Sequence, residues 1–147
     1  MFLKRQLATL FVAVLSISLL WQTESLPAQD ATAQVKALRK ERVELLDDVV
    51  KHLTNGYSVG AVSFDTLIKA KDQALQAKLE LADSPEERIG VLRKLVENAN
   101  MSIRHAQEQV KVGIAKDYEV LQAKAHLLEI RIDLVKEEQK IKPANPK

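Results

Sequence analysis

Residues 57–71 read YSVGAVSFDTLIKAK, and residues 110–124 read VKVGIAKDYEVLQAK. The second stretch begins 53 residues after the first, and both contain Val-Gly followed, ten residues after the glycine, by Ala-Lys. Glycine is the residue that most readily adopts the backbone conformations of a tight turn. The apolar residues after each glycine recur at the spacing of a helix. Each stretch is therefore predicted to be a turn that leads into a helix.

The similarity between the two stretches extends outward at the same offset of 53 residues. Val43-Glu44 recurs as Val96-Glu97, and His52 recurs as His105. Other positions keep their apolar character, as in the pairs Val50/Ile103, Leu75/Leu128, Leu79/Ile132 and Leu81/Leu134. Unrelated amphipathic helices share periodicity, but they rarely share a glycine, a histidine and an Ala-Lys pair in one register. The chain is therefore interpreted as an internal duplication.

The arms around each glycine carry apolar residues at spacings of three, four and seven, which is typical of amphipathic helices. Ser84-Pro85 marks a helix start between the repeats, with Glu87 placed to complete a capping box. Ser63 is the predicted N-terminal cap of the helix that follows Gly60. The predicted fold is all-α: two repeated α-helical hairpins, at about 35–83 and 84–140, form an up-down-up-down four-helix bundle or coiled coil.

The last arm differs from the others because two of its faces are apolar. One stripe has the alternating spacing of a coiled-coil seam and consists of Leu121, Ala125, Leu128, Ile132 and Val135. The second stripe consists of Val120, Leu127, Ile130 and Leu134. A helix of a lone bundle needs one stripe, about 100° wide. The second stripe therefore predicts a protein partner or self-association through helix faces, and a broad core-facing surface is the alternative.

The first 28 residues have the pattern of a secretory signal peptide. Lys4 and Arg5 precede an apolar run from Leu7 to Trp21. That run is shorter than the ~20 residues that span a bilayer, so an uncleaved membrane anchor is the less favoured interpretation. Cleavage is predicted after Ala28, with Ala33 as the alternative position.

Removal of residues 1–28 leaves a predicted four-helix domain at 29–142 and a disordered tail at 143–147, with no membrane span in the mature chain. The predicted location is periplasmic or secreted through Gram-negative-type export, or associated with the outer membrane. Pro143 and Pro146 end the last helix because proline lacks the amide hydrogen that a helix interior requires.

Composition excludes several classes of function. Charged residues make up 29% of the chain, aromatic residues 4%, and the formal net charge is only +2, which argues against nucleic-acid binding. The chain has no cysteine, so disulfides and cysteine-based zinc sites are excluded. It shows neither a glycine-rich phosphate loop nor a nucleophile with a matching base. The chain is thus predicted to be non-enzymatic, with no catalytic residue and no cofactor.

The two repeated histidines raise the question of a metal site. His52 and His105 each lie eight residues before a turn glycine. Asp48 lies one helical turn before His52, and a histidine with a carboxylate at that spacing can hold a divalent metal. Met101 stands at the equivalent position before His105, so two solvent-facing histidines inherited by duplication are the favoured interpretation. No metal site is predicted.

The two glycine turns resemble the periplasmic tips of the TolC family of outer-membrane efflux proteins. The shared features are Val-Gly, a following apolar pair and Ala-Lys ten residues after the glycine, in two copies over about residues 35–139. The resemblance implies that the hairpin tips meet the hairpins of a periplasmic adaptor protein. By position, the tip residues are Val59, Gly60, Val112 and Gly113.

The chain also departs from that family. The short Ser84-Pro85 connection stands where the family has β-strands that build a membrane barrel, so the resemblance covers the coiled-coil part alone and implies no channel. A threonine that the family often places five residues after the glycine is Asp65 in one copy and Tyr118 in the other. The expected function is therefore that of an efflux or transport accessory that packs its helices against partner proteins. A free-standing periplasmic bundle, acting as a stress chaperone or a metal-responsive binding module, is the alternative.

Overall fold

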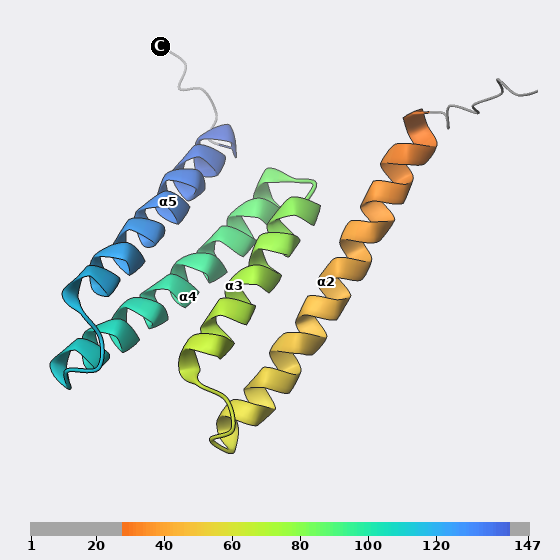
Figure 1. Cartoon of the computed structure of the whole chain (residues 1–147). Helices are drawn as coiled ribbons and strands as arrows, with labels where there is room; N and C mark the ends of the chain where they lie inside the picture. The colour runs from red at the N-terminus through yellow and green to blue at the C-terminus, as the bar shows by residue number, and fades with distance from the viewer. Residues whose placement is uncertain (1–27, 142–147) are drawn as a thin grey trace, which may run out of the picture. The chain divides into compact units, whose positions relative to one another are not determined.

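The computed structural model describes residues 28–141, and α-helices account for most of them (Figure 1). The helices are α2 (Ala28–Ser58), α3 (Phe64–Leu81), α4 (Pro85–Lys111) and α5 (Asp117–Ile141). The described residues form no strand, which confirms the all-α prediction. The predicted signal peptide and tail fall on residues outside this range, except that Ala28 is the first residue of α2.

The two predicted hairpins are present in up-down-up-down order. From Val35 onward, α2 belongs to the same compact unit as α3, α4 and α5. Within this unit the helices follow one another in chain order, with α3 and α4 between α2 and α5 (Figure 1). Both glycine turns lie at one end of the unit, and the α3–α4 connection lies at the other (Figure 1).

The helix starts are fixed by local hydrogen bonds at the predicted residues. The Ser63 hydroxyl accepts a hydrogen bond from the Thr66 amide at 3.2 Å and caps α3. The Ser84 hydroxyl accepts one from the Glu87 amide at 3.1 Å, with Pro85 as the first residue of α4. Glu87 in turn accepts from the amide of Asp83, at 3.0 Å. These caps satisfy amide groups that a helix start otherwise leaves unpaired.

A core of aliphatic side chains joins α3, α4 and α5, with α4 at its centre. Leu92 and Leu95 of α4 are 1% and 0% exposed. They cluster with Leu127 and Ile130 of α5, and side chains of α3 pack against the same cluster. Its other members are Ala99 and Ile103, with Leu75, Leu79, Val91, Val96, Ala123 and Leu134 at its margin. Burial of each large aliphatic side chain stabilises the fold by about 1.5–3 kcal/mol.

The first hairpin is packed more loosely than the second, although the two are repeats. In the part of the chain that the structure describes, no Cα atom of α2 lies within 8 Å of a Cα atom in another helix. Arg39 and Arg42 of α2 occupy the positions that Leu92 and Leu95 occupy in α4. A guanidinium group is costly to bury unless it is paired, and both side chains are exposed and bond to Glu80 of α3 instead of filling a core.

Ion pairs between exposed side chains connect α2 to the end of α3 and the residues after it. Arg42 lies 2.7 Å from Glu80, Lys78 lies 2.7 Å from Asp47, and Lys36 pairs with Asp83. Pairs of this kind contribute at most about 1 kcal/mol each and are screened by salt. Some apolar residues of α2 are half-buried and add partial cover: Val43, Leu46, Val50 and Leu53.

This difference between the hairpins predicts that α2 separates from α3 more readily at high salt. We expect the amide protection of α2 to fall several-fold between about 0.1 M and 1 M NaCl, where the Debye length shortens from about 10 Å to 3 Å. Amides of α4 should keep their protection because aliphatic packing holds that helix. Hydrogen exchange followed by mass spectrometry at low protein concentration measures both. Equal salt responses of α2 and α4 would show that ion pairs do not hold α2.

Candidate functional site

The two glycine turns have the same backbone geometry. Gly60 and Gly113 both have a φ of 75°, the left-handed region that favours glycine. The amide of Gly60 donates to the Tyr57 carbonyl at 3.0 Å, and the amide of Ala61 donates to the Gly56 carbonyl at 2.9 Å. This pair of bonds is the Schellman motif that ends many helices.

The second turn repeats this pattern at equivalent positions. The amide of Gly113 donates to the Val110 carbonyl at 3.0 Å, and the amide of Ile114 donates to the Gln109 carbonyl at 2.9 Å. The helices therefore end at residues 58 and 111, each just before its Val-Gly pair. Asn55-Gly56, which also has the composition of a turn, lies inside α2 instead.

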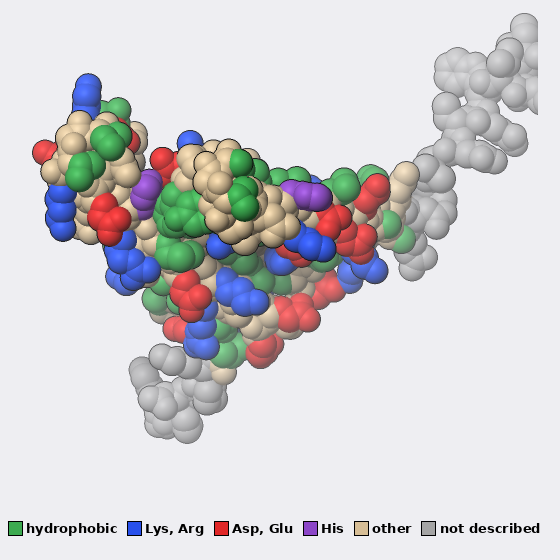
Figure 2. Space-filling view, turned by 90° about the horizontal axis from the view of Figure 1, so that it is seen from below, with side chains coloured by type: hydrophobic (Ala, Val, Ile, Leu, Met, Phe, Trp, Pro, Cys, Tyr) green, Lys and Arg blue, Asp and Glu red, His purple; other side chains and the backbone are tan. Residues whose placement is uncertain are grey.

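Apolar side chains are exposed at both turns. Val59 is 77% exposed in the first turn, while Val112 and Ile114 are 67% and 74% exposed in the second. Figure 2 views the end of the molecule that carries both turns and shows hydrophobic side chains over each of them. Gly60 and Gly113 are exposed as well. The structure thus presents the four predicted tip residues to solvent at one end of the unit.

Because Gly60 and Gly113 have a left-handed backbone and Gly90 does not, alanine should change the stability of the protein in opposite directions at the turns and inside the helix. Gly60→Ala and Gly113→Ala should each lower the free energy of unfolding by about 1–2 kcal/mol, because a side chain at a positive φ is strained. Gly90 provides the matched control: it lies inside α4, and no described atom outside its own helical turn comes within 4 Å of the position that an added methyl group would occupy. Gly90→Ala should raise the free energy of unfolding by up to about 1 kcal/mol.

Urea unfolding followed by circular dichroism measures these differences. The opposite signs at the turn and helix positions are the decisive result. Stabilisation by alanine at residue 60 or 113 would mean that these turns do not hold a left-handed glycine in solution.

The two equivalent histidines have different surroundings. His105 is half-buried, with its ring 4.6 Å from the Phe64 ring and its Nε2 atom 3.5 Å from the Asp65 carboxylate. His52 is exposed on α2. Among residues 28–141, no group of three or more His, Asp or Glu side chains is arranged to hold a metal ion. The contacts of His105 instead join α4 to the start of α3.

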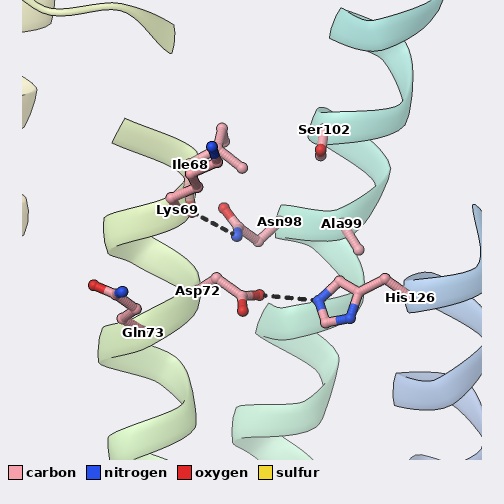
Figure 3. A pocket seen from close by; sticks show the side chains of 8 residues that line it. All are labelled: Ile68, Lys69, Asp72, Gln73, Asn98, Ala99, Ser102 and His126. Carbon is pink, nitrogen blue, oxygen red and sulfur yellow. Dashed lines mark hydrogen bonds and ion pairs between the residues drawn. The ribbon is translucent and has the colours of Figure 1, made fainter. Parts of the chain in front are cut away.

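A pocket lined by both apolar and polar residues lies between α3, α4 and α5 (Figure 3). His126 of α5 lies 3.4 Å from the Asp72 carboxylate of α3. Asn98 of α4 is buried, and its side-chain amide donates to the Ile68 carbonyl at 3.1 Å. The Asn98 side-chain oxygen is buried with no hydrogen-bond partner among the described residues. These contacts fix α3 against α4 and α5 near the middle of the helices.

The pocket does not bring a catalytic triad together. Ser102 lines it together with Asp72 and His126. Figure 3 shows Ala99 between Ser102 and His126, and the imidazole has its polar contacts with the carboxylates of Asp72 and Glu129 instead. A nucleophilic serine needs the imidazole within hydrogen-bond reach. The arrangement therefore serves helix packing and does not position Ser102 for chemistry.

Arg88 forms the second polar connection between three helices. Its Nε atom donates to the Glu137 carboxylate of α5 at 2.8 Å, and its guanidinium also donates to the Leu79 carbonyl of α3 at 3.0 Å. Lys140 lies 2.9 Å from the same carboxylate. These hydrogen bonds, from Arg88 first and then Lys140, hold the pKa of Glu137 below its usual value of 4.5.

The lowered pKa predicts a specific dependence of stability on pH. A carboxylate with a depressed pKa contributes stability above its unfolded-state pKa, and that contribution is lost as the pH falls through the folded-state value. The melting temperature of Glu137→Gln should therefore lie below that of the wild type above about pH 5, and the gap should narrow on acidification. Thermal melts between pH 7 and 3 measure it. Glu97→Gln, at an exposed position of α4, is the control and should show no such gap.

The coiled-coil spacing of one apolar stripe of α5 favours that stripe for the core, but in the structure the other stripe is buried. The stripe that includes Leu127 and Ile130 faces α4. The stripe with coiled-coil spacing is exposed. We call its large members the outer α5 stripe, which consists of Leu121, Leu128, Ile132 and Val135, each 52% to 64% exposed. An exposed set of the same kind, the outer α2 stripe, consists of Val35, Leu38, Leu45 and Val49, each 44% to 61% exposed.

No family model, no curated protein and no solved structure matches the chain. None of the helices within residues 28–141 combines the length and apolar character that a membrane crossing requires.

The two Val-Gly turns are visible in the sequence, but the polar connections between helices are not. Arg88 pairs with Glu137 across 49 positions, and Asp72 pairs with His126 across 54. None of these four residues is matched by the same residue type in the other repeat, so the duplication gives no signal for them. Their partners are determined by how α3, α4 and α5 pack.

Proposed function

We propose that this chain is an exported, non-enzymatic accessory of efflux or transport that binds the helical hairpin of a partner protein through its two tips. The observation that carries the proposal is the pair of equivalent Schellman turns at one end of the unit, each with exposed apolar side chains. Export is supported by the signal-peptide pattern of the first 28 residues. The resemblance of the turns to TolC-type tips supports a periplasmic adaptor as the partner.

The shape of the tips supports binding by helix packing. Each Schellman turn fixes its backbone with two hydrogen bonds, so little conformational entropy is lost when the tip meets a partner. Val59 of one tip and Val112 of the other project at equivalent places, each next to a glycine without a side chain. A small apolar residue beside a glycine lets another helix approach closely. Apolar side chains gathered on an exposed end are typical of a protein-binding surface.

The test is a titration of the purified protein with the α-helical hairpin of a periplasmic adaptor encoded in the same genome, followed by calorimetry. Val59→Asp combined with Val112→Asp should weaken binding at least tenfold, since a carboxylate would lose its hydration in an apolar contact. Circular dichroism should show unchanged helicity, because both residues lie outside the helices.

A matched control places the same charge away from the tips. Ala37→Asp lies on an exposed face near the other end of α2 and should bind as the wild type does. Absence of binding by the wild-type protein, or equal losses in the tip variant and the control, would contradict a role of the tips in partner binding.

A further inference from the structure

The outer α2 and outer α5 stripes lie on the two outermost helices of the unit, with α3 and α4 between them (Figure 1). Neither stripe is covered by another helix within the described residues. The internal duplication indicates what each stripe fits. α2 is the repeat equivalent of α4, and α5 is the repeat equivalent of α3. The repeat equivalent of the α3–α4 contact would therefore be a contact between α5 and α2, and the described residues of one chain do not form it.

The residues of the two stripes match the residues that make the α3–α4 contact. On α3, Leu75 and Leu79 pack against the central cluster, and buried Ile68 lines the pocket shared with Asn98 of α4. Their equivalents on α5 are Leu121, Leu128 and Ile132, three members of the outer α5 stripe. On α4, the equivalents of the outer α2 stripe are Arg88, Val91, Asn98 and Ser102.

Two of these α4 residues bond directly to α3. The Asn98 side chain bonds to the Ile68 carbonyl at 3.1 Å, and the Arg88 side chain bonds to the Leu79 carbonyl at 3.0 Å. Ser102 lines the pocket between these helices. The exposed stripes are thus the repeat counterparts of an interface that already exists in the molecule.

The two hydrogen bonds also fix the register of the missing contact. Because Asn98 meets Ile68, the repeat places Leu45 opposite Leu121. Because Arg88 meets Leu79, it places Val35 opposite Ile132. With antiparallel helices, the same register sets Leu38 opposite Leu128.

The fourth residue of the outer α2 stripe also finds an apolar partner in this register. Val49 falls opposite Tyr118, which is 55% exposed at the start of α5. Every member of the outer α2 stripe therefore meets an exposed apolar residue of α5. The polar side chains that join α3 to α4 are replaced by apolar ones, so the contact is suited to association by burial of apolar surface.

We infer that a second copy of this chain covers these stripes, with α5 of one copy packed antiparallel against α2 of the next. The two stripes of one chain belong to helices that α3 and α4 separate, and the cluster on α4 holds α3 and α5 in place. The two stripes of one chain therefore do not meet in this arrangement, whereas a second copy offers a partner to each of them. The net charges of the two facing segments are opposite in sign, which favours this pairing. Between Asp117 and Val135, α5 carries four carboxylates and two cationic side chains, whereas α2 between Val35 and Leu53 carries five cationic side chains and four carboxylates.

The contact is head-to-tail, because two different surfaces meet. Such an interface produces a closed ring, in which every stripe is covered, or an open filament with one free stripe at each end. This inference goes beyond the proposed function: it concerns the helix faces and not the tips, and its test uses the purified protein alone.

Cysteine cross-linking tests the register, since the chain contains no cysteine of its own. The double variant Leu45→Cys/Leu121→Cys should give disulfide-linked dimers and larger species on mild oxidation. Leu45→Cys/Ile132→Cys is the register control, because its second sulfur lies about 16 Å further along α5 and cannot reach the first. It should remain largely monomeric on a non-reducing gel.

Each alternative gives a different result in this experiment. An internally cross-linked monomer would mean that α2 and α5 of one chain pack together. Efficient dimerisation of the single variant Leu121→Cys would mean that α5 meets α5. Absence of specific cross-links would mean that the stripes do not associate. Each of these three results overturns the inference.

Sedimentation of blocked variants tests the head-to-tail arrangement without a cross-link. Leu38→Asp blocks the outer α2 stripe, and Leu128→Asp blocks the outer α5 stripe. Each variant alone should sediment as a monomer, whereas an equal mixture should form a one-to-one dimer, because each variant keeps the stripe that the other has lost. Gln122→Asp, at an exposed position beside the outer α5 stripe, should associate as the wild type does. A monomeric wild type, or a mixture that remains monomeric, overturns the inference.

Discussion

Aliphatic packing around Leu92 and Leu95 of α4 is the interaction on which the rest of this structure depends. These side chains lose nearly all contact with water and cluster with Leu127 and Ile130 of α5, and α3 packs against the same cluster. The polar contacts of Arg88, Asn98 and His126 surround this core and determine how the helices are aligned along it. α2 lacks the equivalent leucines and depends on exposed ion pairs, so the duplicated sequence folds into two hairpins of unequal stability.

Most of the fold follows from local features that sequence reveals directly. A glycine at each turn, a serine before α3 and α4, and a proline at the first position of α4 act through neighbouring backbone groups. The structure places each of them where the sequence predicts. The duplication adds a constraint that a single helix pattern lacks, because the same turn geometry must fit both copies. The four predicted tip residues are accordingly found at two equivalent turns.

The remaining features depend on packing that periodicity does not determine. Both faces of α5 are apolar, and burial in the structure selects Leu127 and Ile130 over the stripe with coiled-coil spacing. The selection depends on which face meets the leucines of α4. The substitution of those leucines by Arg39 and Arg42 in α2 is visible in the aligned repeats, but its effect on the distance between helices is a tertiary property. Partners such as Asp72 and His126, 54 positions apart in the chain, are neighbours because α3 and α5 both lie against α4.

The central claim, that one cluster on α4 supports α3, α4 and α5 together, is tested most directly by native-state hydrogen exchange of Leu95→Ala. A cavity at a fully buried leucine costs about 2–5 kcal/mol. The slowest amides of α3, α4 and α5 should all lose protection by the same free energy, because all three helices pack on this cluster. A loss confined to α4 and α5, with α3 keeping its protection, would contradict it.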